Sequence, residues 1–292
     1  MKVVEHLVVP KSAAASRCED GLVCTPDFAA VVDGATSKSD RTFADQSPGR
    51  TAMLLVRDAI ATMDPKISAQ EAMTFLDGTI RAWYEEQGLL DEMRTHVVRR
   101  CSAVLVVYSR YRGQIWSLGD CQALIDGVPV DKGSRPEEVL ARVRSMVLYG
   151  ELFRGRTVNQ LLAHDTGREA ILPLLERQVE LQNSELDCEF GYSVLDGFLN
   201  RSDAVRVIPV SGDAREIVFA SDGYPDVYPT LCETETALEE IIRTDPLCFS
   251  RFRATKGVYP GNRSFDDRCY LRIGLADQET VAQMKITSYV IE

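Results

Sequence analysis

The sequence predicts an α+β fold in which antiparallel strands dominate. Strand-like runs rich in Val, Ile and aromatic residues recur from one end of the chain to the other. Helical periodicity is confined to a few blocks and does not follow each strand in turn, so the regular β-α-β alternation of a parallel sheet is absent. Neither a repeat nor a low-complexity linker divides the 292 residues, and we expect one domain spanning 1–292.

The expected strands are short apolar runs bounded by polar or turn-forming residues. They span 7–9, 28–32, 103–108, 114–118, 123–125, 205–210, 216–220 and 269–273. The polar sequence YRG separates the run at 103–108 from the run at 114–118, which predicts a β-hairpin.

Helices are expected where apolar residues recur at spacings of three and four. The first two, 51–63 and 68–87, form an antiparallel pair, and the second opens with a capping box from Ser68 to Glu71. A similar arrangement of Ser134 and Glu137 predicts the start of a later helix. The later helices are expected at 136–148, 168–181 and 233–243.

Composition excludes several classes of partner. A formal charge of −11 and a pI near 4.9 argue against nucleic acid or an anionic membrane surface, because both are bound through clustered Lys and Arg. No apolar run approaches the roughly 18 residues of a membrane span, and Glu5 and His6 interrupt the start of the chain. The eight cysteines are scattered without a C-x-x-C pair. We therefore expect a cytoplasmic protein with reduced cysteines.

Carboxylates recur where apolar runs end or begin. The segments are AAVVDGAT with Asp33, QIWSLGDCQAL with Asp120, EIVFASDGYPDV with Asp222 and Asp226, SFDDRCYLRI with Asp266 and Asp267, and SRCEDGL with Glu19 and Asp20. One such Asp-Gly is commonly only a turn. The repetition instead predicts that several strands deliver carboxylates to one rim of a sheet.

Carboxylates gathered closely repel one another unless protons or cations neutralise them. Oxygen ligands suit hard ions, Mg²⁺ or Mn²⁺, and the chain's three histidines supply a zinc site poorly. Two such ions can polarise a phosphoryl oxygen and supply a hydroxide for in-line attack. The glycine beside a ligand, such as Gly34, lets a carbonyl or substrate approach closely. This pattern predicts a metal-dependent phosphate-ester hydrolase.

In this order, the segments resemble the metal-dependent protein phosphatase family known as PPM or PP2C. The motifs are the E-D pair, VVDG after a buried strand, a helical pair, the hairpin ending in G-D, the S-D-G-x-x-D segment and the late D-D strand. The resemblance implies a four-layer αββα sandwich, two antiparallel β-sheets flanked by helices. It also implies a binuclear Mg²⁺ or Mn²⁺ centre, hydrolysis of phosphoserine and phosphothreonine in a phosphoprotein substrate, and a monomer.

The resemblance assigns the catalytic residues by position. Asp33 would bridge the two ions and Gly34 would offer its carbonyl to one of them. Asp222 and Asp266 would hold the other ion, and metal-bound water would attack the phosphorus. We align Asp266 with the family ligand, not Asp267, because the residues after Asp266 then fit the N-x-T/S that usually follows.

The remaining metal positions also come from the resemblance. Glu19 and Asp20 would act through coordinated water. Asp120 and Asp226, together with Asp222, match carboxylates that hold a third ion in bacterial relatives.

The chain departs from the family pattern at two places. The family often has a phosphate-binding Arg four residues before the Glu, and that position is Ala15; Arg17 is the nearest candidate for the role. Further candidates for phosphate binding are Lys38, Arg41 and Arg268. The residue after Asp-Gly is Ala35, which cannot protonate a leaving alkoxide.

These departures leave alternatives open. One is a catalytically weak PP2C-like protein that regulates or binds a phosphoprotein. Another is a hydrolase of a small phosphorylated metabolite, since the sequence does not define the substrate. A variable flap near the active site is expected within about 130–213.

Overall fold

Two five-stranded antiparallel sheets form the centre of the computed structural model, which describes residues 1–13, 17–130, 137–186 and 188–275. In order, the first sheet contains β1 (Lys2–Val9), β10 (Arg268–Gly274), β9 (Glu216–Ala220), β6 (Gln122–Ile125) and β7 (Val128–Pro129). The second contains β2 (Asp20–Cys24), β3 (Phe28–Gly34), β4 (Ala103–Ser109), β5 (Gln114–Leu118) and β8 (Arg206–Pro209).

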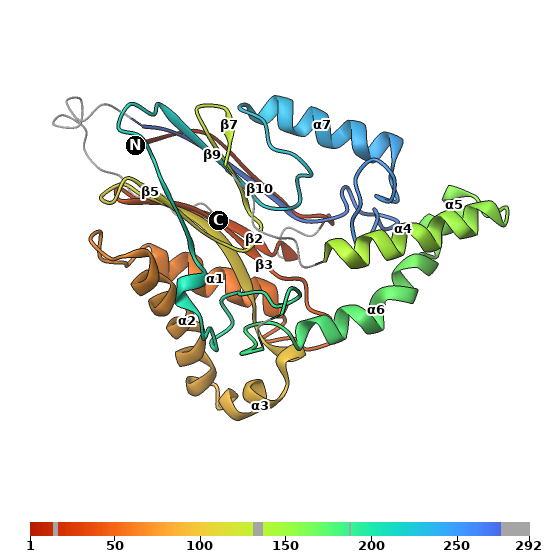
Figure 1. Ribbon diagram of the computed structural model, residues 1–292, viewed down its shortest axis with the longest axis horizontal. Coiled ribbons are helices and arrows are strands. Elements are labelled where there is room, and N and C mark those ends of the chain that lie inside the picture. The colour runs from red at the N-terminus through yellow and green to blue at the C-terminus, as the bar shows by residue number, and fades with distance from the viewer. Residues whose placement is uncertain (14–16, 131–136, 187, 276–292) are drawn as a thin grey trace.

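Helices cover the outer faces of both sheets (Figure 1). Helices α1 (Pro48–Ile60) and α2 (Ala69–Glu86) lie against the second sheet, and α7 (Leu231–Thr244) lies over the first. A buried core between the sheets includes Val31, Val106 and Phe219. The expected αββα sandwich with antiparallel sheets is therefore confirmed.

Local sequence signals explain where the first two helices begin. The Ser47 side chain caps α1 by accepting the backbone N–H of Arg50, and Pro48 occupies the first turn, where a missing N–H costs nothing. The predicted capping box from Ser68 to Glu71 is present at the start of α2. The predicted hairpin is also present, since β4 pairs antiparallel with β5 through a turn containing Gly113.

Several short elements were not expected. Strand β7, helices α3 (Leu90–Thr95) and α5 (Val158–Ala163), and the 3₁₀ turns at Val97–Arg99 and Ser202–Ala204 have too few residues for a periodic pattern. Strand β2 begins with Asp20 and Gly21, which favour turns. Strand β1 is longer than expected. Its residues alternate between exposed and half-buried, so only its last residues form the continuous apolar run on which the prediction relied.

The expected flap contains α4 (Glu138–Phe153), α5 and α6 (Thr166–Val179), and α4 packs against α6. These helices extend from one end of the sandwich (Figure 1). Helix α4 begins two residues after the expected start, and Glu137 is its N-cap without a side-chain capping hydrogen bond. The Glu137 carboxylate instead binds Lys38 and Thr255. Ser134, its expected partner, lies outside the described residues.

Within the described part of the chain, no helix is both long and apolar enough to cross a membrane.

Candidate active site

Strand ends of both sheets bring aspartates together at one edge of the sandwich. Asp20 on β2 lies directly opposite Asp33 on β3, so the two side chains share a face. Asp222 follows β9 of the other sheet, and its backbone N–H lies 3.5 Å from Asp33 Oδ2. Asp120 follows β5 and acts electrostatically on Asp33, as Asp266 does. Aspartates from both sheets therefore lie near Asp33.

Glycines permit the tight backbone geometry around these aspartates. Gly119, before Asp120, has φ +94°, and a Cβ there would lie 2.4 Å from Val104. A Cβ on Gly34 would lie 2.2 Å from the carbonyl oxygen of Gly49 at the start of α1. Each position therefore requires glycine, the first for its positive φ and the second for the close approach of a helix.

Burial and mutual repulsion act on Asp20 and Asp33. Burial, followed by the charge of Asp267, raises the pKa of Asp20 well above its usual range. Burial, followed by the charges of Asp20 and Asp222, does the same for the pKa of Asp33. Asp20 is 4% exposed and its Oδ2 has no hydrogen-bond partner. Such an oxygen is costly to bury unless a cation or proton compensates it.

Glu19 is buried and its carboxylate has three side-chain donors. Ser47 Oγ donates to Oε1 at 2.7 Å, while Thr36 Oγ1 and Lys11 Nζ donate to Oε2 at 2.8 and 3.1 Å. Since Ser47 also caps α1, the helix N-terminus fixes the position of Glu19.

Asp266 lies between two lysines. Lys11 Nζ is 3.1 Å from Oδ1 and Lys256 Nζ is 2.7 Å from Oδ2. Burial alone would raise the pKa of Asp266, but the charges of Lys256 and Lys11 lower this pKa below its usual range. Despite the cost of burial, Asp266, Glu19 and Asp267 together raise the pKa of Lys11.

Asp267 makes a different set of contacts from its neighbour. Its carboxylate accepts the backbone N–H groups of Lys11 at 2.7 Å and of Glu19 at 3.1 Å, and it is 2% exposed. Asp266 lines the cavity beside the carboxylates, and Asp267 is not among the lining residues. Of the two neighbours, Asp266 is thus the one that faces the cavity.

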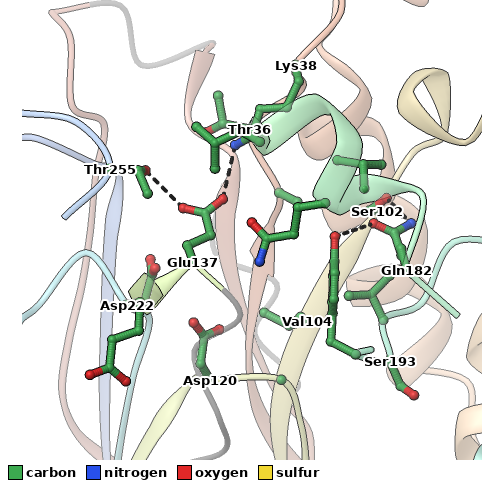
Figure 2. Close-up of a pocket in the computed structure, with 18 of the residues that line it drawn as sticks. Thr36, Lys38, Ser102, Val104, Asp120, Glu137, Gln182, Ser193, Asp222 and Thr255 are labelled. Carbon is green, nitrogen blue, oxygen red and sulfur yellow. Dashed lines mark hydrogen bonds and ion pairs between the residues drawn. The ribbon is translucent and has the colours of Figure 1, made fainter. Parts of the chain in front are cut away.

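A cavity of about 420 Å³ opens beside the aspartates. Figure 2 shows Asp120 and Asp222 at one side of it, Glu137 with Lys38 and Thr255 near them, and Ser102, Gln182 and Ser193 across the space. Arg206, Arg253 and Lys256 also line the cavity. Carboxylates and basic side chains therefore face one space large enough for a phosphorylated side chain.

The other predicted positions lie elsewhere. Asp226 and Arg17 are exposed and are not among the residues that line the cavity. Arg41 pairs with Glu92, and Arg268 makes two hydrogen bonds to Glu235. Of the candidate phosphate-binding cations, only Lys38 lines the cavity. Ala15 lies outside the described residues.

The donor chemistry fits a hard cation only in part. The ligands on offer are carboxylate oxygens alone, from Asp20, Asp33, Asp120 and Asp222. Asp20 Oδ2, which has no hydrogen-bond partner, would be stabilised by a nearby positive charge. Yet among the residues that the structure describes, no group of three or more His, Cys, Asp or Glu side chains is arranged closely enough to hold an ion. Asp266 already has a lysine at each oxygen.

No protein-family model matches the sequence, and no curated protein matches it. Among solved structures, the Mycobacterium tuberculosis serine/threonine phosphatase PstP/Ppp is 15% identical with a TM-score of 0.45, over 94% of this chain and 99% of that one. The serine/threonine phosphatase Stp1 from Staphylococcus aureus is 11% identical with a TM-score of 0.45, over 94% and 96%. The chain is similar to solved bacterial serine/threonine phosphatases.

A second PstP structure, its catalytic domain in complex with two manganese ions, is 13% identical with a TM-score of 0.43, over 94% of this chain and 100% of that one. Because identity and TM-score are low in all three cases, the fold assignment relies on the strand order and register of this chain.

Sequence reasoning missed three residues of this site: Lys11, Lys256 and Glu137. Lys11 follows the apolar end of β1 and Lys256 lies in an irregular segment before β10, and neither belongs to a recognisable motif. Lys11 comes near Asp266 only because β1 pairs with β10.

Proposed function

We propose that this protein is a divalent-cation-dependent phosphatase that hydrolyses phosphoserine or phosphothreonine in proteins. The observation that carries the proposal is the convergence of Asp33, Asp120 and Asp222 from both sheets beside a cavity lined with basic side chains. The order of the motifs, which resembles that of the PP2C family, supports the same activity.

The chain's own residues suggest how the site would work. Asp33, Asp120 and Asp222 would hold the cation, and because no three such side chains of the described residues already lie close enough to do so, these carboxylates would have to draw together on binding. When bound, the cation would polarise the phosphoryl group and lower the pKa of water beside it. Lys38, Arg206 and Lys256 line the cavity and would attract the phosphate dianion. The Ala35 side chain offers no proton, so the leaving alkoxide would take one from solvent.

A second candidate is a catalytically weak protein that binds a phosphoprotein. The observation that favours it is the contact of Lys11 and Lys256 with Asp266, which engages a carboxylate that the resemblance assigns to an ion. On this proposal a phosphorylated partner binds in the cavity and is released unchanged.

Hydrolysis of a phosphoserine or phosphothreonine peptide with Mn²⁺ tests the first proposal. Activity should disappear with EDTA and should fall roughly a hundredfold or more in Asp33→Asn, since even indirect partners of a metal often matter that much. Glu239→Gln, the same loss of charge at an exposed position on α7, should leave activity unchanged.

Three results would contradict it. Activity that persists in EDTA or in Asp33→Asn would exclude a carboxylate-bound cation. Tight binding of the phosphopeptide with turnover near background would instead support the second candidate. Preference for sugar or nucleotide phosphates over phosphopeptides in the same assay would point to a small phosphorylated metabolite.

A further inference from the structure

Asp266 is held by two ammonium groups, one on each carboxylate oxygen. Lys11 Nζ contacts Oδ1 at 3.1 Å, and Lys256 Nζ contacts Oδ2 at 2.7 Å. The two lysines come from opposite ends of the chain, one just after β1 and the other before β10. The contacts are well shielded, with 22% and 14% of the two lysine side chains exposed.

Lys11 also reaches the two neighbouring acids. Its Nζ lies 3.1 Å from Glu19 Oε2 and 3.2 Å from Asp267 Oδ2, and Thr36 Oγ1 accepts a hydrogen bond from it at 3.1 Å. One ammonium group thus lies within ion-pair distance of three carboxylates and donates hydrogen bonds to two of them, Glu19 and Asp266. Together the two lysines bring two positive charges, the same charge as one divalent cation.

The other half of the acidic cluster is different. Asp20 Oδ2 is buried without a hydrogen-bond partner, and the charges that act most strongly on Asp33 are those of other aspartates. Charge at the Asp20 and Asp33 side therefore remains to be compensated, whereas charge at the Asp266 side is already compensated by the chain itself.

We propose that Lys11 and Lys256 take the place of one of the two cations, so that the chain binds a single divalent ion at the Asp33 side of the cluster. The proposal depends on the proposed function for the ion at Asp33, but the role of the lysines can be tested separately. It revises the expectation of a binuclear centre in which Asp266 is a metal ligand.

The physical reason is competition for the same oxygens. An ion at Asp266 would have to displace two ammonium groups that are tethered to the fold and desolvated in place, and the freed charges would then lie beside the ion and repel it. Lys11 is held near Asp266 in addition by its backbone N–H, which donates to Asp267 at 2.7 Å.

Counting bound Mn²⁺ tests the proposal without relying on turnover. Isothermal titration calorimetry, with electron paramagnetic resonance of free Mn²⁺ as a second measurement, should give one ion per wild-type chain. In Lys11→Met/Lys256→Met, whose side chains keep most of their length and lose their charge, the count should rise to two. Lys38→Met removes a cavity lysine that pairs with Glu137, and its count should stay at one.

Other outcomes separate this inference from the proposed function. Two ions of similar affinity in the wild-type chain, or one ion in both the wild type and a folded double variant, would overturn the inference. If the wild type bound no ion and the double variant bound one, the result would support the proposal that the two lysines take the place of an ion. The same result would contradict the proposed cation at Asp33. If the double variant does not fold, the number of ions bound by the wild type still tests the inference. The single variant Lys256→Met should then bind a second ion more tightly than the wild type does.

Discussion

At the scale of single residues, Gly34 determines how closely α1 approaches the acidic cluster. Its position was expected to allow the approach of a carbonyl or substrate, and the group that lies closest is the backbone of Gly49. A Cβ at Gly34 would also lie 2.8 Å from the carbonyl oxygen of Glu19. Both contacts are with backbone atoms, which cannot rotate away as a side chain can.

Gly34→Ala should therefore destabilise the protein by about 1–3 kcal/mol, the usual cost of overpacking. Urea unfolding at neutral pH measures the change. Gly78→Ala is the matched control, because Gly78 lies in α2 and a Cβ there would meet no atom within 4 Å. Alanine there should stabilise the protein by up to about 1 kcal/mol through helix propensity. Equal effects of the two substitutions would contradict this account.

The aspartates of the site were predictable because each one adjoins a strand whose apolar run the sequence reveals. Asp33 lies at the end of β3, and Asp120 and Asp222 follow β5 and β9, so their meeting needed only the strands to share an edge. The lysines were not predictable for a physical reason. Lys11 and Asp266 meet through pairing between segments at opposite ends of the chain, and local sequence does not encode such pairing.

At the scale of elements, Arg144 connects the flap to the segment that carries Lys256. It lies on α4 and is fully buried. Its guanidinium binds Asp165, the N-cap of α6, at 2.6 and 3.0 Å. It also donates to the carbonyl oxygens of Leu247, Cys248 and Ala254.

Arg144→Met should cost about 3–5 kcal/mol of unfolding free energy, because it leaves a carboxylate and three carbonyls without their donor. Arg142→Met, two residues earlier on the same helix, removes an exposed ion pair with Glu138 and should change stability by at most about 0.5 kcal/mol. Urea unfolding of both variants makes the comparison. A change below about 1 kcal/mol in Arg144→Met would show that water satisfies these groups.

Elements with a continuous apolar run or a clear helical periodicity were predicted best. The strand at Glu216–Ala220 has the expected bounds, and α1 and α2 lie within three residues of theirs. Strand β2 was missed because it begins with Asp20 and Gly21, residues that favour turns, and is a strand through its pairing with β3. In α4, the start depends on contacts of Glu137 that are distant in sequence.

At the scale of the whole molecule, a buried network joins α2 to the segment between α6 and β8. Asp77 accepts the backbone N–H groups of Asp196, Gly197 and Leu199 at 2.9, 2.8 and 3.0 Å. Asp196 in turn binds Arg100 at 2.9 Å. Burial, followed by the charge of Asp196, raises the pKa of Asp77 to about 6.

This pKa predicts how stability depends on pH. Because the folded pKa of Asp77 exceeds its value of 3.8 in the unfolded chain, the stabilisation from its protonated form is complete below about pH 4 and is lost as pH rises through about 6. The wild type should lose about 3 kcal/mol across this window from Asp77 alone.

Comparing the wild type with Asp77→Asn in urea from pH 4 to 7 isolates that contribution from other carboxylates. The stability of the wild type relative to the variant should fall by about 3 kcal/mol as pH rises. Asp203→Asn, at an exposed site, should show no such trend. A difference that stays constant or grows with pH would contradict the raised pKa.

The pairing of β1 with β10 also sets an order of events during synthesis. The first strand emerges from the ribosome early, and its partner Arg268–Gly274 emerges only near the end of the described chain. At about 5–20 residues per second, β1 waits roughly 13–50 seconds for it. Until then Lys11 has no contact with Asp266. The contact between Lys11 and Asp266 is therefore a late step of folding, completed only once Arg268–Gly274 has been synthesised.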